Sequence, residues 1–125
     1  MVKVCLDFET AVSFLRGENT TLEKLKYYAD REEICVTSFT MMHLLDMVKK
    51  PEVVSAFTNG VTILPFDRKA AHIAAHIMAN DLKDQVDLHK KMEGIMTAAV
   101  CIANDALLFS RSPSKFEGIK GVNKV

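Results

Sequence analysis

The sequence lacks any apolar run near the ~20 residues that a bilayer-spanning helix needs. Its 125 residues also contain no internal repeat and no low-complexity segment. The opening MVKVCLDFET places Asp7 and Glu9 directly after a short apolar run, so it lacks the long apolar region of a signal peptide. We therefore expect a soluble, cytoplasmic protein with no membrane segment. Its length favours a single domain over residues 1–125 with one buried core.

Cysteine and net charge are low as well. Cys5, Cys35 and Cys101 lie far apart and form no C-x-x-C pair, which excludes the usual paired-cysteine zinc and dithiol sites. We expect buried thiols in a reducing compartment. Lys plus Arg and Asp plus Glu number 16 each, so the net charge gives no sign of a strong polyanion binder. Any contact with nucleic acid must then come from a local patch.

Short apolar runs of strand length alternate with stretches of helical period. The pattern predicts strands at 2–8, 33–38, 61–66 and 106–110. It predicts helices at 9–17, from Thr20 or Thr21 onward, and at 39–50, 51–60, 67–83 and 88–105. Because parallel strands need crossover connections, this alternation predicts an α/β fold with a parallel sheet covered on both faces.

Polar residues that suit helix starts follow the predicted strands. Asp67 is expected to cap the helix at 67–83, and Ser112 to cap a short turn that begins at Pro113. Ligand crevices of such sheets lie at the carboxyl ends of the strands. We therefore expect the crevice where Asp7, Ser38, Asp67 and Ser112 fall.

Four segments, in this order and spacing, resemble the PIN domain family, best known from VapC-type toxins of toxin–antitoxin pairs. They are VCLDFETAVSFLRGE, ICVTSFTMMHLL, ILPFDRKAAHIAAHI and GIMTAAVCIANDALLFSRSPSKFEGIKGV, and together they cover nearly the whole chain. The resemblance implies a PIN-like three-layer fold, with a twisted parallel sheet of four to five strands flanked by helices. It also implies a homodimer, an antitoxin-like protein partner, and cleavage of RNA that depends on magnesium or manganese.

The resemblance further implies four acidic side chains in the nuclease site, and three of them are replaced here. The first falls on Asp7. The second position holds His43 in TMMHLL, the third holds Gly94, and the fourth holds Ser112. Glu93 is next to the third position, and a helical step of about 100° per residue predicts that it points away from the site, although a long side chain can curl back. Because magnesium is held by carboxylates together with waters and phosphates, one carboxylate rarely suffices.

Two functions therefore stand beside each other. The leading hypothesis is a VapC-like PIN protein with a degenerate metal site, inactive or weak as a ribonuclease, that acts by binding RNA or a protein and needs no cofactor. The alternative is an active endoribonuclease toxin using Mg or Mn, in which Asp7 and Glu9 hold the metal and His43 completes a rearranged site. The candidate catalytic residues are Asp7, Glu9, His43, Glu93 and Ser112. A third hypothesis is an assembly subunit that mainly dimerises.

The remaining candidates have ordinary structural explanations beside the functional ones. Ser110, Arg111 and Lys115 are candidate nucleic-acid contacts, although scattered basic residues usually form a solvated face. His72 and His76 stand four apart on one helix face, but the H-E-x-x-H pattern of metalloproteases is broken. A helix boundary or dimer contact explains them as well. The methionines of the helices suit core filling, a dimer surface or a peptide groove.

Overall fold

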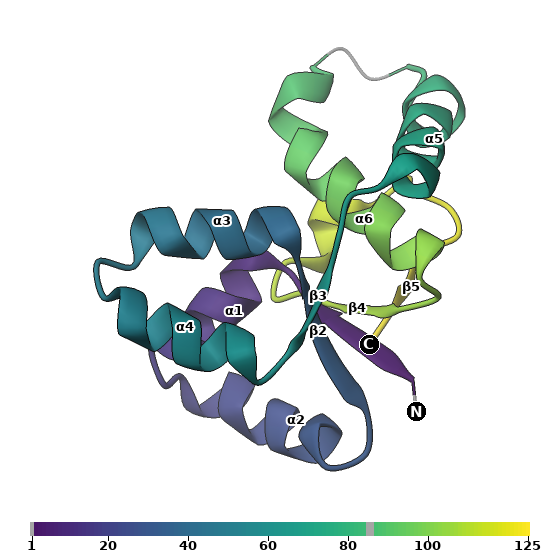
Figure 1. The fold of residues 1–125 in the computed structure, drawn as a ribbon. Helices are drawn as coiled ribbons and strands as arrows, with labels where there is room; N and C mark the ends of the chain where they lie inside the picture. The colour runs from purple at the N-terminus through teal and green to yellow at the C-terminus, as the bar shows by residue number, and fades with distance from the viewer. Residues whose placement is uncertain (1, 85–86) are drawn as a thin grey trace.

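The computed structural model describes residues 2–84 and 87–125, so Met1, Gln85 and Val86 of the predicted domain lie outside the described residues. Figure 1 shows the elements in space. In chain order they are β1 (Lys3–Leu6), α1 (Phe8–Leu15), α2 (Asn19–Ala29), β2 (Glu33–Thr37), α3 (Ser38–Met47), α4 (Pro51–Asn59), β3 (Thr62–Leu64), α5 (Arg68–His76), the π-helical turn η1 (Ile77–Asp81), the 3-10 turn η2 (Leu88–Lys91), α6 (Met92–Ala103), β4 (Leu107–Phe109), the 3-10 turn η3 (Pro113–Phe116) and β5 (Asn123–Lys124).

The five strands form one parallel sheet in the order β3-β2-β1-β4-β5. The predicted α/β class and the sheet of four to five strands are confirmed. All four predicted strands are present, each shorter than the apolar run that predicted it. The fifth, Asn123–Lys124, is exposed and pairs only with β4, so it carries no apolar signal that sequence could offer.

Helices cover both faces of the sheet, as predicted (Figure 1). On one face, Val4 and Leu6 of β1 belong to the core that includes residues of α1 to α4. On the other face, Cys5 packs into the core that includes α5 and α6. Successive side chains of a strand point to opposite faces, so β1 supplies both cores. This three-layer arrangement explains why the central strands are almost wholly apolar.

The three cysteines are buried free thiols, which confirms their expected state. Burial raises the pKa of the Cys35 thiol to about 11. The pKa of Cys5 is also raised, chiefly by its contact with the Cys101 thiol and then by burial. Cys5 and Cys35 therefore stay protonated at neutral pH, and all three cysteines are small side chains of the core.

Most helix boundaries differ from the prediction by a few residues, and α3, predicted at 39–50, ends at Met47. The α2 N-cap is Glu18, so the expected cap at Thr20 or Thr21 is wrong. Gly17 adopts φ 75°, and the Glu18 amide donates to the Ser13 carbonyl, so the chain turns directly from α1 into α2. The helix predicted at 67–83 changes to a π-helical turn at Ile77, and the one predicted at 88–105 begins with the 3-10 turn η2.

Across residues 2–84 and 87–125, the helices are too short or too polar to cross a bilayer.

Core packing at α3 gives the first testable prediction. Leu44 is fully buried, whereas Met42 of the same helix is 65% exposed. Leu44→Ala should lower the free energy of unfolding by about 2–5 kcal/mol, because the deletion removes buried surface and leaves a cavity. The matched change Met42→Ala should alter it by no more than about 0.5 kcal/mol. Urea unfolding monitored by circular dichroism measures both, and equal effects would contradict the described packing.

Candidate functional site

A cleft of about 480 Å³ opens at the carboxyl end of β1. Figure 1 shows α1 and α3 on one side of the sheet and α6 on the other, and all three helices contribute residues to the lining of the cleft. Its lining comes from four segments far apart in the sequence: Asp7, Phe8, Glu9, His43, Lys90, Lys91, Glu93, Gly94, Thr97, Ser114, Lys115 and Phe116. Of the four crevice residues expected at strand ends, Asp7 lines this cleft and Ser112 bonds to a lining residue. Ser38 and Asp67 lie outside the lining, and Asp67 caps α5 as predicted.

Asp7 is held rigidly between β1 and α1. It is 6% exposed and is the N-cap of α1, where its Oδ1 accepts a hydrogen bond from the Thr10 amide at 3.0 Å. Its Oδ2 accepts a hydrogen bond from the Ser110 hydroxyl at 2.5 Å. Both carboxylate oxygens therefore accept hydrogen bonds from the protein. One of the donors, Ser110, directly follows the last residue of β4.

Glu9 is held by the segment that follows β4. Its Oε2 accepts a hydrogen bond from the Ser112 hydroxyl at 3.0 Å, and its Oε1 forms an ion pair with the Lys115 ammonium. The Lys115 hydrogen bond, helped by Ser112, lowers the pKa of Glu9 below its ordinary value. Ser112 stands at the N-cap position of η3, but its hydroxyl makes no capping bond, so its predicted capping role is wrong.

His43 and Glu93 face each other across the cleft. The His43 Nδ1 lies 3.3 Å from the Glu93 Oε1, and the imidazole stacks on Phe8 with ring centroids 3.8 Å apart. The expectation that Glu93 points away from the cleft is wrong. Glu93 lies in the first turn of α6, and the cleft reaches across both Glu93 and Gly94, so the long side chain meets α3.

The replaced acidic position at Gly94 still has room for a Cβ atom. A Cβ built there would meet the Lys115 carbonyl oxygen and the Phe116 ring at 3.7 Å, which is ordinary van der Waals contact. The surrounding residues have therefore not closed over this position.

The predicted nucleic-acid contacts have protein partners. Arg111 pairs with Glu18 at 3.0 Å and donates to the Ser13 hydroxyl at 2.5 Å, outside the lining of the cleft. Ser110 and Lys115 bond to Asp7 and Glu9 as described above. His72 and His76 are exposed on α5, and the His76 Nδ1 lies 3.1 Å from the Asn80 side-chain amide.

The donor set does not suit a resident magnesium ion. Magnesium requires near-octahedral oxygen ligands, and each cleft carboxylate is already engaged by a donor or cation of the protein. Among the described residues, no three of the His, Cys, Asp and Glu side chains are grouped so that they could hold a metal. The cleft as folded is therefore a network of ion pairs and hydrogen bonds.

Comparison with known proteins identifies the fold. No family model matches the sequence, and no curated protein matches it. Solved structures do match over the full length. A chain of VapBC2 from Rickettsia felis, bound to a promoter DNA fragment, has a TM-score of 0.79 at 17% identity, covering 99% of this chain and 98% of that one. A chain of DNA-bound VapBC from Salmonella typhimurium has a TM-score of 0.77 at 22% identity, with 100% and 98% covered.

A chain of VapBC-1 from nontypeable Haemophilus influenzae gives a TM-score of 0.77 at 15% identity, with 99% of this chain and 97% of that chain covered. The fold is PIN-like. The predicted PIN-like architecture is thus confirmed. Because the sequence identities are below 25%, the similarity shows the fold alone.

Three features of this PIN-like cleft escaped sequence reasoning: the Glu9–Lys115 ion pair, the stack of Phe8 on His43, and the position of Glu93. The first joins residues 106 positions apart, and the His43–Glu93 contact joins residues 50 apart. No local period encodes such contacts. The sequence did contain one local indication for Lys115. It lies two residues after Pro113, and Ser112-Pro113 is a typical start of a short helical turn.

The ion pair of Glu9 gives a prediction about pH. Because the folded-state pKa of Glu9 is lowered, its contribution to stability is present above the unfolded-state pKa and is lost as pH falls through the folded-state pKa. The titration midpoint of the Glu9 carboxyl, measured by NMR, should lie below its ordinary value of about 4.3. Lys115→Met should raise it, whereas Lys90→Met should leave it unchanged. A wild-type midpoint at or above the ordinary value contradicts the described pair.

Proposed function

We propose that this chain is a VapC-like protein of the toxin–antitoxin type whose metal site is degenerate. It is inactive or weak as a ribonuclease and acts through binding. The carrying observation is that Asp7, Glu9 and Glu93, the carboxylates that line the cleft, are each engaged by hydrogen-bond donors or a histidine of the protein. A nuclease metal would lower the pKa of an attacking water, and that task needs a fixed ion.

The charge balance of the cleft supports this proposal. Three carboxylates line it, and three lysines, Lys90, Lys91 and Lys115, line it as well. Negative charge gathered by several acids normally draws a divalent cation into a site. Here the protein itself supplies the compensating positive charge, so the electrostatic drive for metal is weak.

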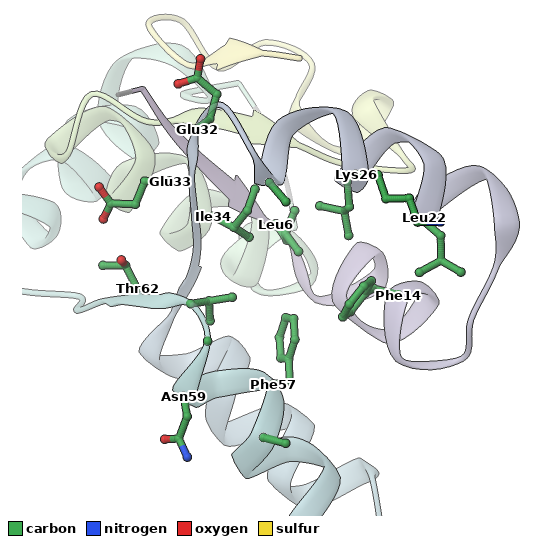
Figure 2. Close-up of a pocket in the computed structure, with 15 residues that line it drawn as sticks. Leu6, Phe14, Leu22, Lys26, Glu32, Glu33, Ile34, Phe57, Asn59 and Thr62 are labelled. Carbon is green, nitrogen blue, oxygen red and sulfur yellow. The ribbon is translucent and has the colours of Figure 1, made fainter.

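A second hollow supports binding to a protein partner. It has a volume of about 720 Å³ and lies between α2 and α4 over β2. Figure 2 shows the Phe14 and Phe57 rings inside it, with Leu22 and Lys26 of α2 opposite, and the two phenylalanine centroids lie 5.4 Å apart. Apolar grooves of this kind accept amphipathic segments of partner proteins. The similar chains come from VapBC complexes, and one further match is a toxin–antitoxin complex from Klebsiella pneumoniae. We therefore assign the groove to an antitoxin-like protein.

RNA contact, a homodimer and a cytoplasmic location stay predictions. The Lys90, Lys91 and Lys115 ammonium groups stand at the cleft where phosphates of an RNA can approach. Met42, Leu45, Met47 and Val53 form an exposed apolar set on α3 and α4 that suits a second copy of the chain.

The groove assignment can be tested with two neighbouring positions of α4. Ala56 lines the groove, whereas Ser55 is exposed on the same helix outside its lining. Ala56→Arg should abolish co-purification with a co-expressed antitoxin-like protein, because it places a bulky charge in the groove. Ser55→Arg should leave the complex intact. Equal retention by both variants would remove the groove from the proposal.

Metal binding tests the function itself. Isothermal titration calorimetry with Mn²⁺ should show no saturable binding at millimolar metal for the wild type or for Asp7→Asn. Saturable wild-type binding that disappears in Asp7→Asn would overturn the degenerate-site proposal.

That opposite outcome would favour the alternative, an active Mg- or Mn-dependent endoribonuclease with a rearranged site. One observation supports it. The same cleft is lined by Asp7, Glu9, His43 and Glu93, although Asp7 is the only acid that the family pattern places there. Cleavage assays on structured RNAs would then follow.

A further inference from the structure

We propose that the Lys115 ammonium is a built-in counter-ion that holds closed a divalent-cation site formed by Asp7 and Glu9. The inference rests on the proposed function, because it gives a physical cause for the absence of metal binding that the proposed function predicts. It adds that a single lysine causes this, in addition to the loss of the family's acidic residues.

Asp7 and Glu9 are linked through two serines. The Ser110 hydroxyl donates to Asp7, and it accepts a hydrogen bond from the Ser112 amide at 3.0 Å. The Ser112 hydroxyl in turn donates to Glu9 at 3.0 Å. The two carboxylates therefore lie at the ends of one short hydrogen-bonded chain. Two carboxylates together with several waters are a normal ligand set for magnesium or manganese.

Lys115 is brought to this pair by an anchored turn. Phe116, the next residue, is 2% exposed and belongs to the core, while Pro113 begins the same 3-10 turn. Proline restricts the backbone at the start of the turn. Because the turn is fixed at both ends, the lysine side chain starts from a defined position close to Glu9. Its ammonium pairs with Glu9 although the side chain is 55% exposed.

A tethered cation has an advantage over one from solution. The ammonium is attached to the same domain as Glu9, so its effective concentration there far exceeds that of a dissolved metal ion. It also places a positive charge where a second cation would have to enter. Without the ammonium, Glu9 and Asp7 would leave two negative charges linked by neutral serines, an arrangement that a divalent cation stabilises.

The cleft offers a matched control for this idea. Lys90 also lines the cleft, but its ammonium lies 3.5 Å from Asp87, and its side chain is 84% exposed. Removing Lys90 changes the net charge as much as removing Lys115, yet it leaves the Glu9 pair intact. If Lys115 has a specific role, the Lys115 and Lys90 variants must therefore differ in metal binding.

The experiment is Mn²⁺ titration of the full chain, followed by calorimetry and by electron paramagnetic resonance of free Mn²⁺. Lys115→Met keeps the aliphatic stem and should gain one saturable site, with an affinity at least about tenfold above that of wild type. Lys115→Gln is the second variant if the first does not fold, as judged by circular dichroism. Lys90→Met should bind as weakly as wild type. The double variant Lys115→Met/Glu9→Gln should lose the gained site.

The outcomes separate this inference from the proposed function. No gain in folded Lys115→Met or Lys115→Gln overturns the inference while the degenerate-site proposal stands. An equal gain in Lys90→Met also overturns it, since the effect would then be general electrostatics. Saturable binding by the wild type overturns the proposed function and, with it, the closed site.

Discussion

The parallel pairing of β1 with β4 is the constraint on which the cleft depends. Leu6 pairs with Phe109, so the next residues, Asp7 and Ser110, emerge side by side at the carboxyl end of the sheet. The Asp7 amide continues the ladder by donating to the Phe109 carbonyl at 3.2 Å. A shift of register by one residue would turn these side chains to the other face. The contacts of Asp7 and Glu9 both follow from this register.

The carboxylates of the cleft are held by hydrogen-bond donors and basic groups of the protein itself. A buried carboxylate needs compensating donors, and here the backbone of α1 and the hydroxyl of Ser110 provide them for Asp7. Glu9 and Glu93 are more exposed, and each finds a basic partner on another segment. The same contacts that hold these side chains in place also use part of the lone pairs that a metal would need.

The two hollows lie on different parts of the fold and suit different ligands. Acids and lysines make up half of the cleft lining, whereas the groove between α2 and α4 is lined mainly by apolar side chains, two phenylalanine rings among them, with Lys26, Glu32 and Glu33 beside them. A polar site at the strand ends and an apolar groove between helices can serve separate partners. A change of chemistry in the cleft therefore does not require a change of binding in the groove.

The sequence by itself determined the alternation of strands and helices, the cap at Asp67, the buried thiols and the position of Asp7 at a strand end, because these depend on local period and local hydrogen bonds. It did not determine that Glu93 faces His43, that Lys115 pairs with Glu9, or that Ser112 bonds to Glu9 instead of capping a turn. Those contacts join residues 50 to 106 positions apart. Only the packing of α6 and η3 against the sheet brings them within hydrogen-bonding distance, so the tertiary structure decided them.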